Sequence, residues 1–132
     1  MTTHPTTGEL VSAVSAFLER LTPSLPPREA FMARVAQNAL GIVARELAQG
    51  PDAEAAGRAR LAALLGRDEP LDALISELCR ALRAGELDAG SPGLAEALKA
   101  NTLAQLAIDQ PDYRWRAEAT GTPTRSSAQE ST

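Results

Sequence analysis

A helical pattern runs without a break from residue 28 to residue 49 and constrains the fold more than any other part of the sequence. At about 100° per residue, one face of this segment forms an apolar stripe. The stripe consists of Phe31, Val35, Ala39, Ile42 and Val43. A helix with such a stripe buries it against other helices, which predicts an all-α bundle.

The first helix before this segment has a clear start signal. Thr6 and Glu9 form a capping box, in which each side chain bonds the backbone N–H of the other residue. Leu10, Val14 and Phe17 then share one face of a helix that is expected to stop at 22–23, where threonine precedes proline.

Glycine and proline divide the rest of the chain. The Gly50-Pro51 pair is expected to end the long helix, because glycine adopts the left-handed conformation that follows a helix. Further helices are expected at about 52–65, from Pro70 to a stop at Gly85, and from a Ser91-Pro92 start to residue 109. The sequence therefore predicts a single-domain bundle of about five helices over residues 6–115, between a flexible N-terminus at 1–5 and a disordered tail at 116–132.

Charge and hydropathy limit the partners of this chain. A net charge of −4 argues against nucleic-acid binding, which needs a concentrated basic surface. No apolar run approaches the roughly 20 residues that cross a bilayer, and no signal peptide is recognisable. We therefore expect a bacterial cytoplasmic protein that binds neither nucleic acid nor membrane. Cys79, the only cysteine, lies in a leucine-rich helical pattern and is expected to be buried.

The usual equipment for metal binding and catalysis is missing from the sequence. His4 is the only histidine, so the ligand spacings of zinc and di-iron sites are absent. Paired acidic residues at 86 and 88 and at 109 and 112 are the only candidates for a magnesium site, and acidic residues at helix ends are usually just solvated. Cys79 has no histidine to activate it, and no glycine-rich loop matches a nucleotide-binding motif. We predict no catalytic residues, no metal and no cofactor.

One polar set stands out against the apolar stripe of the long helix. Its members are Arg34, Asn38, Arg45 and Glu46, joined by Asn101 and Gln105 of the last helix. As a binding site, the set would form an anion or acyl-chain pocket, with arginine bonding a carboxylate or phosphate. As a structural feature, it would be a buried network that fixes how the two helices meet, with Glu46 bonded to an arginine or to the last helix. We favour the structural interpretation.

Two aromatic residues follow Pro111. Tyr113 is interpreted as an anchor that folds the chain end back over the bundle. Trp115 has either that role or the role of an exposed contact residue.

Three stretches together resemble a known family: 5–10, 31–40 and 102–113, with the Arg-Glu-Leu sequence at 45–47 between them. They resemble a small bacterial domain family of unknown function. Its members are typically encoded beside acyl-CoA dehydrogenase-like and aminoglycoside-phosphotransferase-like proteins. The resemblance covers about residues 5–113 and implies a context in acyl-CoA metabolism without implying a reaction.

Three functions are compatible with these observations. The favoured one is an accessory protein that binds a dehydrogenase-like or kinase-like partner and pairs with itself as a homodimer. The alternative is a helical bundle that binds an acyl chain or acyl-CoA. An enzyme that uses Arg34, Asn38 and Glu46 is the least favoured.

Overall fold

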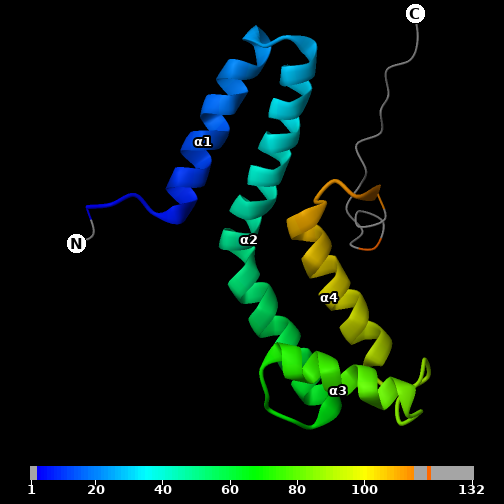
Figure 1. The fold of residues 1–132 in the computed structure, drawn as a ribbon. Coiled ribbons are helices and arrows are strands. Elements are labelled where there is room, and N and C mark those ends of the chain that lie inside the picture. Colours follow the sequence, from blue (N-terminus) through cyan, green and yellow to red (C-terminus); the bar gives the residue numbers. More distant parts are fainter. Residues whose placement is uncertain (1–2, 115–118, 120–132) are drawn as a thin grey trace, which may run out of the picture.

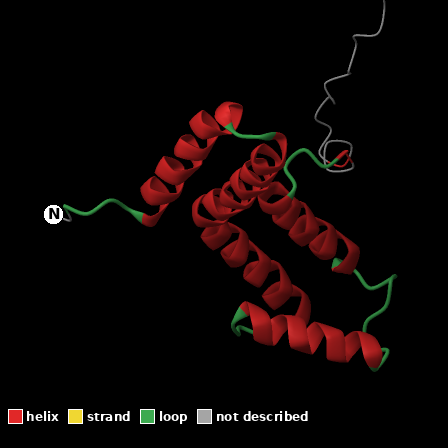
Figure 2. Ribbon diagram, turned by 45° about the horizontal axis from the view of Figure 1, so that its top comes forward, coloured by secondary structure: helices red, strands yellow, loops and turns green. Residues whose placement is uncertain are grey.

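The structure, a computed structural model, describes residues 3–114 and residue 119, and within them every regular element is helical. The all-α prediction is confirmed, with four α-helices in place of about five. They are α1 (Thr7–Leu21), α2 (Pro27–Leu65), α3 (Leu71–Arg83) and α4 (Leu94–Asp109), with a short 3-10 helix η1 (Thr22–Ser24) between the first two (Figures 1 and 2). Apart from residue 119, the predicted tail at 116–132 lies outside the described residues.

Helix α1 begins where the sequence predicts. Thr6 Oγ1 accepts from the N–H of Glu9 at 3.2 Å, and Glu9 Oε2 accepts from the N–H of Thr6 at 2.6 Å. The helix runs antiparallel to the first half of α2 (Figure 1). No residue of α1 is buried, so this pair of helices encloses no core of its own.

The predicted helix end at Gly50-Pro51 is wrong. Helix α2 runs through both residues without interruption and is 39 residues long in total. A proline inside a helix removes one backbone hydrogen bond and clashes with the preceding turn. Gly50 reduces the conflict, since the clash that disfavours helix before proline involves the Cβ atom that glycine lacks. The helix bends instead of ending, and Figure 1 shows its change of direction about half way along.

The core lies beyond that bend, where α3 and α4 pack against the second half of α2. It is built from Leu61 of α2, Leu74 and Leu78 of α3, and Leu94 of α4. Leu74 and Leu78 belong to the leucine-rich helical pattern that surrounds Cys79 in the sequence. Gly66, with φ of 67°, provides the left-handed residue that lets the chain leave α2 and turn into α3.

Helix α4 starts later than predicted. Its first residue is Leu94, and the Ser91 hydroxyl accepts from the N–H of Asp88 in the preceding turn instead of capping the helix. Its end at Asp109 is as predicted. The helix packs against α2, also as predicted. No helix among the described residues is long and apolar enough to span a membrane.

We predict that Leu74→Ala lowers the free energy of unfolding by about 2–5 kcal/mol, because the Leu74 side chain is fully buried and its removal leaves a void. Leu82→Ala is the matched control on the same helix, since Leu82 is 39% exposed and should cost less than about 1 kcal/mol. Urea denaturation of the two variants measures the difference. Equal losses would show that the core lies elsewhere.

Candidate functional site

The structure separates the six polar residues that the sequence singles out. Arg34 and Asn38 are exposed on the first half of α2. Glu46, Asn101 and Gln105 instead line one cavity beside the bend, and Arg45 lies next to them. Arg34 is twelve residues before Glu46, which is about 18 Å along a helix. An active site that combines Arg34 with Glu46 is therefore not formed.

Arg45 joins α2 to the end of α4. Its Nε donates to the carbonyl oxygen of Ile108 at 2.6 Å, 63 residues away in the sequence. This carbonyl is one of the last four of α4, which have no N–H partner within the helix. A cation at this end of a helix also interacts favourably with the helix dipole. The bond from Arg45 therefore links the two helices, and its partner is a backbone carbonyl and not Glu46.

The predicted burial of Glu46 is wrong. Its side chain is exposed, and it forms no ion pair with any residue in the described part of the chain. Its carboxylate lies along Gly50, where an added Cβ would come within 2.7 Å of Oε1. Asn38 and Glu46 are exposed and Ile42 is partly covered, because α4 lies mainly beside the second half of α2. The polar groups of Asn38 and Glu46 are solvated, so they require no buried partners.

The two amides of α4 also have other partners than expected. Asn101 Oδ1 accepts from Arg60 Nε at 2.8 Å, and Gln105 Nε2 donates to Asp109 Oδ2 at 2.9 Å. Neither bonds Arg34, Asn38 or Glu46. The Arg60–Asn101 bond links a side chain of α4 directly to a charged side chain of α2, in addition to the Arg45 bond to the Ile108 carbonyl.

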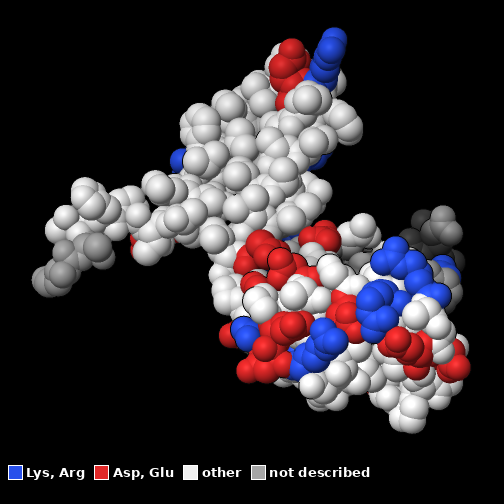
Figure 3. All heavy atoms as spheres, turned by 60° about the horizontal axis from the view of Figure 1, so that its bottom comes forward, with Lys and Arg blue, Asp and Glu red and all other residues white. Residues whose placement is uncertain are grey.

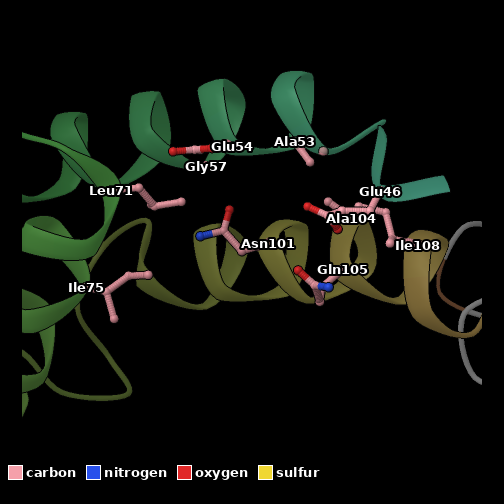
Figure 4. A pocket seen from close by; sticks show the side chains of 11 residues that line it. Glu46, Ala53, Glu54, Gly57, Leu71, Ile75, Asn101, Ala104, Gln105 and Ile108 are labelled. Carbon is pink, nitrogen blue, oxygen red and sulfur yellow. The ribbon is translucent and has the colours of Figure 1, made fainter. Parts of the chain in front are cut away.

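The cavity has a volume of about 310 Å³ and lies where α2, α3 and α4 meet. Figure 4 shows Glu46 and Glu54 on α2, Asn101 and Gln105 on α4, and Leu71 at one end. This volume is at the lower limit for small-molecule pockets. Two carboxylates and two amides line it together with small and apolar side chains, so its chemistry suits a neutral or cationic group and disfavours a phosphate or carboxylate.

Small residues of α2 create this cavity, a role that the sequence analysis missed. Gly50, Ala53 and Gly57 are spaced so that they share one face of the helix, and all three line the cavity. Gly57 is buried beside Asn101, whose Oδ1 would lie 3.4 Å from an added Cβ. The signal was present in the sequence as small residues at helical spacing.

The chain matches the family described as Domain of unknown function (DUF6285) over residues 23–113. It belongs to this family. The sequence resemblance to a small domain family of unknown function is thereby confirmed. No curated protein and no solved structure matches the chain. The matched segment begins within η1 and ends after α4, so α1 precedes the DUF6285 segment.

Reactive and metal-binding groups are dispersed in this DUF6285 protein. Cys79 is exposed on α3, which corrects the prediction that it is buried. Among the described residues, no group of three or more histidine, cysteine, aspartate or glutamate side chains is arranged to hold a metal. Three of the four acidic residues considered for magnesium have other partners: Glu86 bonds Arg80, Asp88 accepts from the N–H of Gly90, and Asp109 accepts from Gln105.

Tyr113 is 41% exposed, so its ring is only partly covered by the rest of the molecule. This exposure does not suit the anchor that the sequence predicts. Trp115 lies outside the described residues.

The most strongly coupled charges of the DUF6285 segment lie at the end of α3. Arg80 bonds Glu77 at 2.6 Å and Glu86 at 2.8 Å. The hydrogen bonds from Arg80 hold the pKa of both carboxyl groups below the usual glutamate value. The same bonds raise the pKa of Arg80. This network closes the turn after α3 and lies apart from the cavity-lining residues.

We predict that Glu46→Ala lowers the free energy of unfolding by less than about 1 kcal/mol, because the carboxylate is exposed and unpaired among the described residues. Arg45→Ala should cost about 1.5–3 kcal/mol, since it removes a charge-assisted bond to a helix carbonyl. Chemical denaturation compares the two. A larger loss for Glu46→Ala than for Arg45→Ala would contradict these assignments.

A second prediction concerns pH. Because the pKa values of Glu77 and Glu86 are lowered in the folded chain, their contribution to stability is present above the ordinary glutamate pKa of 4.5. It is lost as the pH falls through the lowered values. Arg80→Ala should therefore reduce the thermal midpoint at pH 7 and have little effect at pH 2.

Arg83→Ala, an exposed arginine of the same helix, is the control for Arg80→Ala and should leave the midpoint unchanged at both pH values. A loss from Arg80→Ala that persists undiminished at pH 2 would show that Arg80 acts through packing and not through the two carboxylates.

Proposed function

We propose that this DUF6285 chain is an accessory protein that works by binding other protein chains. The observation that carries the proposal is the apolar surface of α1 and of the first half of α2. Eight large hydrophobic side chains of these two segments are exposed: Leu10, Val14, Phe17, Phe31, Met32, Val35, Val43 and Leu47. Contiguous apolar surface of this kind marks protein contact sites.

The first half of α2 supports the proposal further, because its apolar residues point in almost all directions. Ala30 and Ala33 face α1, Phe31 and Val35 point away from it, and Val43 lies on a third side. A helix with apolar residues on several sides is normally buried on several sides, although Arg34 and Asn38 are also exposed here. In this chain α1 covers one side, so the other sides are available to a partner.

The partner class follows from the family resemblance in the sequence. An acyl-CoA dehydrogenase-like or phosphotransferase-like protein is the partner we propose, with a role in acyl-CoA metabolism in a bacterial cytoplasm. The side of α2 that carries Phe31, Met32 and Val35 is proposed as its contact surface, since it lies opposite α1 and is open in the described chain.

The cavity beside Glu46 supports a second candidate, a small-ligand binder. Its lining disfavours acyl-CoA itself, because Glu46 and Glu54 would repel the phosphates of that ligand. A neutral or cationic molecule suits it better. We place this candidate second because the cavity is at the lower limit of volume for a ligand pocket and its carboxylates are exposed.

The proposal predicts that the chain binds a dehydrogenase-like or phosphotransferase-like protein from its own organism, and that Phe31→Ser weakens the binding at least about tenfold. Leu82→Ser on α3 is the control, since it removes an exposed leucine far from the hairpin and should have no effect. Calorimetric titration with each purified candidate measures the affinity. Acyl-CoA turnover by the chain alone, combined with no binding of either candidate, would overturn the accessory role.

A further inference from the structure

We propose that a second copy of this chain covers one defined side of the α1–α2 hairpin, so that two hairpins form a four-helix bundle. The inference rests on the proposed role in protein binding and names the occupant of one face. That face consists of an α1 stripe and an α2 stripe. The first is Leu10, Val14 and Phe17, and the second is Leu40, Val43 and Leu47.

Both stripes lie on the same side of the hairpin. The residues of α1 that face α2 include Val11, Ser15 and Leu18, and the exposed stripe lies about a quarter-turn from them. On α2, the stripe lies about a quarter-turn from Ala30 and Ala33. Both rotations have the same sense when each helix is viewed from its N-terminus. In an antiparallel pair of facing helices, rotations of the same sense point to the same side.

Helices α1 and α2 approach each other closely, but their contact buries little apolar side chain and leaves the α1 stripe uncovered. The buried members of this contact on α2 are Ala30 and Ala33, and α1 contributes only partly covered residues. Alanine side chains allow close approach of the helices but remove little apolar area from water. A fifteen-residue helix is marginal without tertiary packing, so a further layer on this side would stabilise it.

The charge distribution favours a copy of the same face as that layer. Figure 3 shows a mostly uncharged surface over the arm formed by α1 and the first half of α2, with charged side chains at its tip and edges, beside a densely charged surface over the α3 end of the molecule. None of the six stripe residues is charged or polar. An uncharged apolar face is complementary to itself, which is the requirement for the isologous interface of a two-fold dimer.

The size of the face agrees with what a dimer needs. Val14, Phe17 and Val43 are between 43% and 54% exposed, and Leu10 and Leu47 lie in the same range. These five side chains, together with the partly buried Leu40, offer on the order of 500 Å², taking roughly 150–250 Å² for a fully exposed aromatic residue. With the alanines between the stripes, this approaches the roughly 600–1,000 Å² per partner of stable interfaces.

The opposite side of α2 supplies a matched control. Phe31 is 58% exposed, against 54% for Phe17, and belongs to the surface proposed for a different partner. Phe17→Glu and Phe31→Glu place the same charge at equally exposed phenylalanines. Neither position contributes to the leucine core, so both variants are expected to fold. Circular dichroism and the thermal midpoint verify this.

Sedimentation velocity of the full chain from about 1 to 200 µM tests the proposal. The wild type and Phe31→Glu should sediment at twice the 13.9 kDa of one chain. Phe17→Glu should sediment as a monomer, with a dimer Kd raised at least about 100-fold, because the two-fold interface receives the substitution twice. Val43→Glu, on the other helix of the same face, should give the same result.

Three outcomes would overturn the dimer. They are a wild type that stays monomeric at about 200 µM, a dimer disrupted by Phe31→Glu and not by Phe17→Glu, and a dimer insensitive to both. A monomer that still binds a dehydrogenase-like or phosphotransferase-like protein would overturn the dimer alone and leave the accessory role standing. A dimer that binds neither protein would overturn the accessory role and leave the dimer standing.

Discussion

Helix α2 is the constraint on which the rest of this structure depends. It is about 58 Å long at 39 residues, and all close approaches between two α-helices within residues 3–114 involve it. The other helices are arranged along it: α1 beside its first half, and α3 and α4 beside its second half. The molecule is therefore elongated, and the two halves of α2 are covered by different helices. These covering helices decide which side chains are buried and which are exposed at each end.

The two ends differ in what holds them together. At the α3 end, Leu61, Leu74, Leu78 and Leu94 exclude water, and salt bridges surround them on the surface. At the α1 end, hydrogen bonds such as the one from Gln37 Nε2 to Thr22 Oγ1 fix the hairpin turn, but no side chain of α1 is buried. An apolar surface without a core is typical of a segment completed by another molecule, and α1 is also the helix that precedes the matched DUF6285 segment.

Local signals in the sequence predicted the local structure well. The capping box at Thr6 appears as predicted. The helical spacing of leucines in α3 is also a short-range pattern, and it places Leu74 and Leu78 in the core, whereas Leu82 is exposed. The course of α2 through Pro51 could not be predicted this way, because the packing of α4 and the missing Cβ of Gly50 decide it. For the same reason Glu46 was misplaced: a helical stripe predicts a buried face only where another element covers it. Exposure of Cys79 depends likewise on which side of α3 meets α2.

The backbone hydrogen bonds of α2 should open less readily on one side of the Gly50-Pro51 bend than on the other. Beyond the bend, the leucine core ties the amides to global unfolding, so their hydrogens should exchange with solvent only when the whole molecule unfolds. Before the bend, α1 and η1 provide most of the cover within residues 3–114, and local opening of the hairpin suffices for exchange. Within one continuous helix, the amide hydrogens are thus protected from exchange to two different degrees. The boundary lies at a proline, a residue that has no amide hydrogen to exchange.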